Sequence, residues 1–273
     1  MSPKDIIITG CDGNYFEKFG GNFLSSIQKY IKNDVIIFII FSGSVNTFNK
    51  LNLENKNDNI YFLHDIDLIK LPSKTNNFTY LQHLPLSLLN MLVIEKYRSN
   101  KIIRKIFKIL LKFINPTLLI DRNHLHQTRL RPYYTTLRFL IPEYYLNNSK
   151  NILICDIDSH FNFNPFEFSS NFRSETIYAV MREFNTECWS KFLTGILLFK
   201  GANATRNYLL FQEKIINRIL NSEIFWGMDQ YEFDIFSNYH HVCPLPNDFY
   251  SFHSNSSAVI ETYKGDLKWS KMK

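Results

Sequence analysis

The stretch NILICDIDSHF, residues 151–161, sets four apolar residues directly before two aspartates that are one residue apart. A short apolar run of this kind predicts a buried strand of a parallel sheet. Open α/β sheets bind their ligands beyond the carboxyl ends of the strands, so Asp156 and Asp158 are expected at a binding edge. If the strand continues to Asp158, both carboxylates point to one face, because alternate strand residues share a face.

Two carboxylates this close repel each other unless a cation lies between them and a ligand. Mg²⁺ and Mn²⁺ prefer carboxylate and phosphate oxygens, so the pair predicts a metal–diphosphate site. The alternative is a polar strand end that closes a turn, since Asp-x-Asp often arises by chance. We favour the functional interpretation because the apolar run places the pair at the end of a buried strand.

Segments on both sides of this motif predict an α/β fold. Strand-like apolar runs occupy residues 5–10, 35–41, 60–66, 175–181 and 192–200. Helical spacing of apolar residues is found at residues 21–33, 84–114, 131–149 and 206–220. A strand, a helix and a strand in succession near the N-terminus indicate a βαβ unit and therefore a parallel sheet. The chain after Pro244 and Pro246 is expected to be irregular.

Length and composition indicate a folded protein that handles anions. The 273 residues allow one large α/β domain or two small ones, and the lack of an obvious linker favours one. A hydrophobic content of 45% with 21% charged residues argues against disorder. The net charge of +6 fits a partner such as a nucleotide, a nucleic acid or an acidic membrane surface.

Cysteine spacing and hydropathy indicate a reduced, cytoplasmic protein. The four cysteines are far apart, which argues against a disulfide scaffold or a zinc knuckle. The N-terminus turns polar after three isoleucines, too early for a signal peptide. No apolar run approaches the roughly 20 residues of a transmembrane helix.

Basic residues line one side of the helix predicted over residues 84–114, at Lys101, Arg104, Lys105, Lys108 and Lys112. Such a helix could lie on an anionic bilayer, which predicts a peripheral contact at the inner membrane face through residues 101–112. The preferred alternative is the solvated face of a helix packed into the fold. We expect no nucleic-acid partner, because no recognised motif surrounds these residues.

Two classes of enzyme place Asp-x-Asp after an apolar strand. In haloacid-dehalogenase-like phosphatases the first aspartate is a nucleophile assisted by Mg²⁺, but the motif usually lies near the start of the domain. Here the stretch begins only at residue 151, and no clear acidic pair follows it. Nucleotide-sugar glycosyltransferases of the GT-A type carry the motif in mid-chain, so its position favours them.

Six segments resemble, in the correct order, the GT-A glycosyltransferases of the glycogenin and bacterial lipopolysaccharide galactosyl/glucosyltransferase family (family 8-like). They are ITGCDGNYFEKF (8–19), YYTTLRFLIPEYY (133–145), DID (156–158), FLTGILLFK (192–200), WGMDQYEFDIF (226–236) and VIETYKGDLKWSK (259–271). The resemblance implies a Rossmann-like GT-A domain over residues 1–273, with a central, mainly parallel mixed sheet. Residues 84–128 would form a helical insertion.

The first two segments imply contacts with the donor. Asp12, Asn14 and Tyr15 would hold the base and ribose, because a carboxylate can accept the uracil N–H and a tyrosine ring can stack on the base. Arg138 would face the diphosphate or the sugar, since a guanidinium suits phosphate oxygens. The alternative for this residue is an ion pair with Glu143 on the same predicted helix.

The resemblance implies that Asp158 binds Mn²⁺ or Mg²⁺ most directly, while Asp156 touches both ribose and metal. Asp229 would hold hydroxyls of the donor sugar, and Gln230 would lie near the anomeric carbon. A neutral amide is a poor nucleophile, so Gln230 would stabilise an oxocarbenium-like state. Leu193 stands where the family usually has asparagine, although the following Gly195 matches.

The last segment matches the family at Gly265, Lys268 and Trp269, but Thr262 stands where a metal-binding histidine belongs. Gly265 would let backbone N–H groups approach the diphosphate, and Lys268 would neutralise it as UDP leaves. A hydroxyl is a weaker Mn²⁺ ligand than an imidazole. The metal would then rest on two aspartates, diphosphate and water, or His253 would substitute.

These residues together predict a hexosyltransferase that moves a hexose from a UDP-sugar to a glycan, glycolipid or protein acceptor, with retention and metal assistance. An inverting enzyme would need a general base near the acceptor, which Glu183, Glu187 or Asp229 could supply. The sequence also leaves open a phosphatase that forms phospho-Asp156 and an inactive protein that only binds a sugar nucleotide.

Overall fold

The computed structural model describes residues 3–55, 57–69, 130–147, 149–181, 191–221, 227–251 and 257–262. The predicted helical insertion at residues 84–128 and its basic segment at 101–112 lie outside these ranges. Among the helices within them, none combines the length and the apolar character needed to cross a bilayer.

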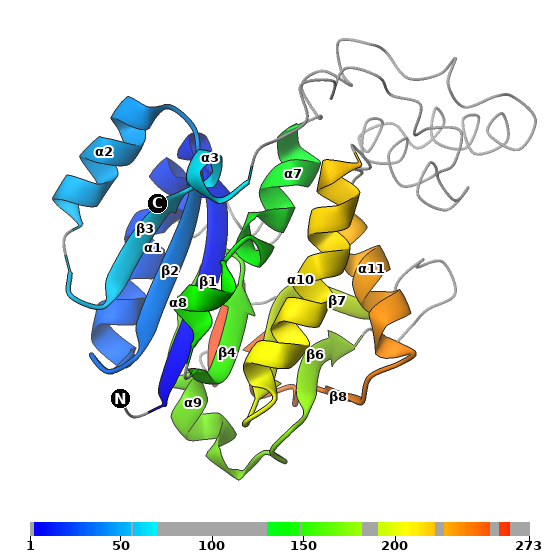
Figure 1. Ribbon diagram of the computed structural model, residues 1–273. Coiled ribbons are helices and arrows are strands. Elements are labelled where there is room, and N and C mark those ends of the chain that lie inside the picture. Colours follow the sequence, from blue (N-terminus) through cyan, green and yellow to red (C-terminus); the bar gives the residue numbers. More distant parts are fainter. Residues whose placement is uncertain are drawn as a thin grey trace, which may run out of the picture.

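A seven-stranded sheet forms the centre of the fold (Figure 1). Its order is β3 (Ile60–His64), β2 (Ile36–Ser42), β1 (Lys4–Asp12), β4 (Ser149–Cys155), β7 (Phe192–Lys200), β6 (Ile177–Met181) and β8 (Val242–Pro244). Strands β3, β2, β1 and β4 are parallel neighbours, whereas β7 runs antiparallel to both β4 and β6. The expected α/β fold with a central, mainly parallel mixed sheet is confirmed.

Helices and a smaller sheet surround these strands. The helices are α1 (Gly13–Tyr30), α2 (Val45–Glu54), α3 (Asp65–Leu68), α7 (Leu130–Thr136), η3 (Leu137–Phe139), α8 (Glu143–Leu146), α9 (Pro165–Phe168), η4 (Ser169–Asn171), α10 (Ala204–Leu220) and α11 (Met228–Ser237). The smaller sheet has the order β5 (Ser159–Phe161), β10 (Ile260–Thr262) and β9 (Tyr250–Ser251). Two of its strands, β9 and β10, lie in a C-terminal region that the sequence predicted to be irregular.

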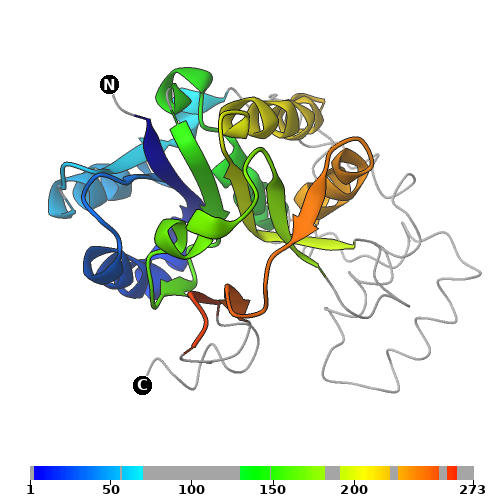
Figure 2. The ribbon, with the colours of Figure 1, turned by 90° about the horizontal axis from the view of Figure 1, so that it is seen from below.

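Alternation along β1 divides the core into two apolar layers. Ile7 joins Phe23 of α1 in a cluster that also includes residues of the smaller sheet. Ile6 and Ile8 face the other way and share a cluster with Phe211 of α10. Figure 2 shows α1 and α10 on opposite sides of the central sheet. Both faces of β1 are therefore buried, which explains its nearly continuous apolar sequence.

Two predicted helices differ from those in the structure. The helix predicted over residues 21–33 begins at Gly13, because the carboxylate of Asp12 caps its first turn. The helix predicted over residues 131–149 is divided between α7, η3 and α8, with Pro142 as the N-cap of α8. A proline has no backbone N–H and disfavours helical geometry in the residue before it, so the helix is interrupted there.

The order of the strands creates a topological switch point between β1 and β4. The chain moves from β1 outward to β2 and β3, and then returns to the other side of β1 to form β4. Because β1 and β4 are parallel and paired, as at Ile8 and Ile154, their carboxyl ends lie side by side. Open α/β sheets bind ligands in the crevice at such a point.

Candidate functional site

The Asp156–Asp158 pair forms a turn directly beyond β4. The strand ends at Cys155, and the N–H of Ser159 donates to the carbonyl oxygen of Asp156 at 3.0 Å. The N–H of Asp156 donates to the carbonyl oxygen of Gly195 on β7, also at 3.0 Å. The strand does not continue through Asp158, so the condition for a shared face is not met. Each carboxylate has its own surroundings.

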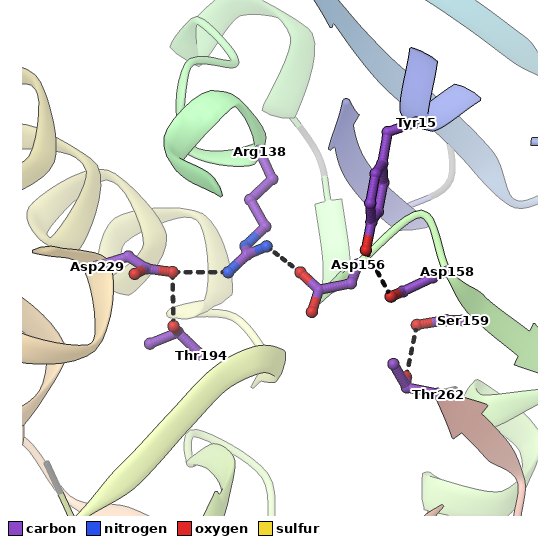
Figure 3. Close-up of polar contacts among 8 residues, drawn as sticks. All are labelled: Tyr15, Arg138, Asp156, Asp158, Ser159, Thr194, Asp229 and Thr262. Carbon is purple, nitrogen blue, oxygen red and sulfur yellow. Dashed lines mark hydrogen bonds and ion pairs between the residues drawn. The ribbon is translucent and has the colours of Figure 1, made fainter. Parts of the chain in front are cut away.

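Arg138 connects Asp156 to Asp229 (Figure 3). Its Nη1 donates to Oδ1 of Asp156, and its Nη2 donates to Oδ2 of Asp229 at 2.7 Å. Arg138 is 4% exposed and the Asp229 side chain 3%, whereas the Asp156 side chain is 24% exposed. Burial lowers the pKa of Arg138, but the charges of Asp156 and Asp229 outweigh this effect and raise its pKa. The guanidinium is therefore a permanent cation between two carboxylates.

The backbone around Arg138 is fixed by close packing and by side chains of α10. A Cβ added to Gly10 of β1 would lie 2.6 Å from Cβ of Leu137 and 2.8 Å from the backbone nitrogen of Arg138. The hydroxyl of Tyr208 donates to the carbonyl oxygen of Arg138 at 3.2 Å. Nε2 of Gln212 donates to the carbonyl oxygens of Phe139, the last residue of η3, and of Ile141. The position of the arginine thus depends on β1, η3 and α10 together.

Asp229 lies in the first turn of α11 and accepts a second hydrogen bond from β7. The hydroxyl of Thr194 donates to its Oδ2 at 2.7 Å. A carboxylate in the first turn of a helix also interacts favourably with the helix dipole. Gln230 is the next residue along α11 and is partly exposed.

The Asp158 side of the turn is surrounded by hydroxyl groups. Tyr15 of α1 donates to Oδ2 of Asp158 at 3.0 Å, and Asp158 is 5% exposed. Oγ of Ser159 lies 3.1 Å from Oγ1 of Thr262, which is paired with it across β5 and β10. Burial raises the pKa of Tyr250 well above its usual value, a hydrogen bond with Thr262 partly offsets this, and Asp156 and Asp158 raise it further.

Asp12 and Tyr15 connect the end of β1 with this turn. Oδ1 of Asp12 accepts the backbone N–H of Tyr15 at 2.9 Å, while Asn14 is exposed. Burial raises the pKa of Tyr134, and the charges of Asp12 and Asp65 raise it further, so these groups lie near one another. Of the residues expected at the base, Asp12 ends β1 as the N-cap of α1, and Asn14 and Tyr15 lie in the first turn of that helix.

The structure brings five of the predicted site residues together, namely Tyr15, Arg138, Asp156, Asp158 and Asp229. The alternative ion pair between Arg138 and Glu143 is wrong, because Arg138 pairs with the two aspartates while Glu143 is exposed on α8. Several further predicted residues lie outside the described ranges and are not placed. These are Glu183, Glu187, His253, Gly265, Lys268 and Trp269.

Sequence reasoning missed four residues of the site: Gly10, Ser159, Thr194 and Tyr250. Gly10 ends the apolar part of a strand and precedes Asp12 by two residues, which hints at close packing near a binding edge. Thr194 interrupts an apolar strand with a polar side chain, and a buried hydroxyl requires a partner. Ser159 and Tyr250 gave no local signal, because their place depends on the smaller sheet.

The donor set around the turn suits a hard divalent cation. It consists of the carboxylates of Asp156 and Asp158 and nearby hydroxyls, and oxygen ligands of this kind are preferred by Mg²⁺ and Mn²⁺. Within the described residues, no group of three or more histidine, cysteine, aspartate or glutamate side chains forms a metal site. A cation held by these two carboxylates would need further oxygen ligands, which a phosphate group and water can supply.

Comparison with known proteins gives structural neighbours but no sequence relatives. No protein-family model matches the chain, and no curated protein matches its sequence. The glycosyltransferase GlyE of Streptococcus pneumoniae TIGR4 is similar with a TM-score of 0.49 and 11% identity, over 99% of this chain and 57% of that one. The chain thus spans a little over half the length of GlyE.

Two further glycosyltransferases are similar at comparable distance. The galactosyltransferase LgtC, in complex with donor and acceptor sugar analogues, has a TM-score of 0.44 and 13% identity over 96% of this chain and 87% of its own. Mouse xyloside xylosyltransferase 1 has a TM-score of 0.41 and 10% identity over 96% of this chain and 98% of its own. The chain is similar in structure to glycosyltransferases, and its activity has to be argued from the site.

Proposed function

We propose that this protein is a hexosyltransferase that moves a hexose from a UDP-sugar to a saccharide, lipid-linked or protein acceptor. The observation that carries the proposal is the Asp156–Asp158 turn at the switch point between β1 and β4. A diphosphate bound at the carboxyl edge of this sheet would lie beside the two carboxylates, where a divalent cation can join them. Tyr15, from the first turn after β1, already contacts this turn.

The residues along the turn would divide the donor between them. Asp12, Asn14 and Tyr15 would bind the base and ribose, with Asp156 contacting the ribose from the other side. Asp229 would accept hydrogen bonds from hydroxyls of the hexose, because its carboxylate is oriented by two donors from the protein. Gln230, next to it on α11, would then lie near the anomeric carbon.

Departure of UDP is the step that needs the most assistance, because negative charge develops on the leaving diphosphate. Mn²⁺ or Mg²⁺ on Asp156 and Asp158 would neutralise part of that charge when bound. Arg138 holds the carboxylates of Asp156 and Asp229 in place through its two ion pairs. Gly265 and Lys268 are proposed to contact the diphosphate through backbone N–H groups and an ammonium group.

Retention of anomeric configuration belongs to the same proposal. A neutral amide at Gln230 would favour stabilisation of an oxocarbenium-like state over a covalent intermediate. NMR assignment of the product anomer tests this directly. A product of inverted configuration would rule out retention and would favour a general base such as Glu187 or Asp229.

Calorimetric titration of UDP, with and without Mn²⁺, tests the metal–diphosphate site. We expect UDP to bind the wild-type protein more tightly with Mn²⁺, and Asp158→Asn to lose that difference. Asp58→Asn is the matched control, because Asp58 is exposed and lies before the amino end of β3, whereas the site lies at the carboxyl ends of the strands. A screen of UDP-hexoses for UDP release then tests turnover.

The outcomes separate the proposal from its rivals. UDP binding that does not depend on Mn²⁺ would remove the metal from the proposal. Basic side chains would then have to bind the diphosphate. UDP binding without turnover of any donor would indicate a sugar-nucleotide-binding protein. No UDP binding, together with release of phosphate from a simple ester, would support the phosphatase alternative.

A further inference from the structure

Thr194 is a buried polar residue of β7 to which the sequence assigned no role. Its side chain is fully buried, and its hydroxyl donates to Oδ2 of Asp229 at 2.7 Å. The same oxygen accepts from Nη2 of Arg138 at 2.7 Å. Figure 3 shows the threonine and the arginine reaching this carboxylate from different elements.

Two donors on one oxygen restrict how the Asp229 carboxylate can turn. A carboxylate with a single ion pair can rotate and exchange its two oxygens, whereas a second donor from a rigid strand opposes this rotation. Both hydrogen bonds that the structure gives Asp229 end on Oδ2, so Oδ1 keeps a defined direction. Recognition of a sugar hydroxyl requires an acceptor that is held in this way before the substrate binds.

The neighbouring residue explains why this contact comes from Thr194. Residues 193 and 194 point to opposite faces of β7, because side chains alternate along a strand. Leu193 brings no polar group to the site. The polar contact that β7 makes with Asp229 is therefore that of Thr194, and the strand holds it rigidly.

We propose that Thr194 is a positioning residue for Asp229, whose hydroxyl fixes the carboxylate for recognition of the donor hexose. This inference rests on the proposed hexosyltransferase activity. It predicts that loss of the hydroxyl impairs the use of the sugar while the UDP part of the donor binds as before. A role in packing alone would not separate these two properties.

The test compares Thr194→Val with Thr194→Ser. Valine keeps the volume and the branched shape but removes the hydroxyl, while serine keeps the hydroxyl and removes a methyl group. Thr9→Val is the matched control, since Thr9 is fully buried in β1 and its hydroxyl has no hydrogen-bond partner among the described residues. Each protein is assayed for UDP affinity by calorimetry and for kcat/KM with the UDP-hexose that the wild type uses best.

We expect Thr194→Val to bind UDP within about twofold of the wild type and to lose about tenfold or more in kcat/KM, the effect of one hydrogen bond to a charged group. Thr194→Ser should recover most of that loss, and Thr9→Val should match the wild type. The inference is overturned if Thr194→Val keeps its kcat/KM, if serine is as poor as valine, or if UDP affinity falls in parallel. A wild-type protein that turns over no UDP-hexose contradicts the proposed function itself and removes the inference with it.

Discussion

Asp156 and Asp158 are separated by a single residue in the sequence, yet their side chains lie in different surroundings. On one side, Asp156, Arg138 and Asp229 form two ion pairs that share one guanidinium. On the other side, Asp158 accepts a hydrogen bond from the hydroxyl of Tyr15. The next residue, Ser159, is paired with Thr262 in the smaller sheet, and the hydroxyls of these two residues are in contact. One carboxylate is balanced by a fixed cation and the other by neutral donors.

This difference indicates where an added cation would act. The Asp156 side already contains an arginine whose pKa is raised by its two partners, so it stays charged at any physiological pH. The hydroxyl groups on the Asp158 side stabilise its carboxylate but do not neutralise the negative charge. We therefore expect a divalent metal to depend more on Asp158, and the ion pairs to determine the position of Asp156. Four changes test this comparison, beginning with the one of largest expected effect.

Arg138→Met should cost about 3–5 kcal/mol of unfolding free energy, because it leaves two buried or half-buried carboxylates without their cation. Arg138→Lys should cost less, since it keeps the charge but loses the planar fork that reaches both partners. Urea denaturation of both variants measures the effect. Wild-type stability in Arg138→Met would show that the ion pairs do not hold the Asp156 side together.

Gly10→Ala should cost about 1–3 kcal/mol, because its Cβ would lie 2.6 Å from Cβ of Leu137 and would displace η3. Gly21→Ala is the control, since its Cβ would meet nothing within 4 Å and alanine favours the helix by about 0.5–1 kcal/mol. The same denaturation assay compares them. Equal stability of the two variants would contradict the close approach of β1 to Arg138.

Thr262→Val should cost about 1 kcal/mol, because it removes a hydroxyl that Ser159 contacts and leaves that serine buried. Adding Ser159→Ala should then cost little, since both partners of one contact are gone. A double-mutant cycle, read by thermal or urea unfolding, measures this coupling. Strictly additive losses would mean that the two hydroxyls do not interact.

Acid should weaken the Asp158 side through His160, and this effect should be the smallest. Burial lowers the pKa of His160, while Glu261 raises it and Lys29 lowers it. The neutral histidine contributes fully above its unfolded pKa of about 6.5, and this contribution is lost as the pH falls through the lower folded pKa. The melting temperature of His160→Asn should therefore fall less between pH 7 and pH 5 than that of the wild type. Equal falls would exclude His160 as a source of acid sensitivity.

Several features of the fold could be predicted because they depend on local patterns. The strand predicted over residues 192–200 agrees with β7 at both ends, since a strand buried on both faces is mostly apolar. The helix predicted over residues 131–149 is interrupted, because Pro142 restricts the backbone more strongly than apolar spacing favours a helix. The helix predicted over residues 21–33 begins earlier, at Gly13, because the carboxylate of Asp12 caps its first turn.

The sequence predicted which residues belong to the site better than it predicted their contacts. Asp156, Asp158, Arg138 and Asp229 were all named from the sequence, and the structure joins three of them through one guanidinium. Closeness in the chain suggests a pair between Arg138 and Glu143, but Arg138 pairs with Asp156 and Asp229 instead. Charged side chains select partners by distance in space, which the local sequence does not encode.

The sequence by itself determined the buried strands, the parallel order implied by a βαβ start, and the place of two aspartates at a binding edge. Only the tertiary structure decided which groups meet there. Arg138 reaches an aspartate 91 residues away, and Ser159 meets a threonine 103 residues away. The first contact exists because η3 packs against β1 and α11 packs against β7 of the central sheet, and the second because β5 and β10 pair in the smaller sheet. Strand order is set by packing of the whole chain and not by any one segment.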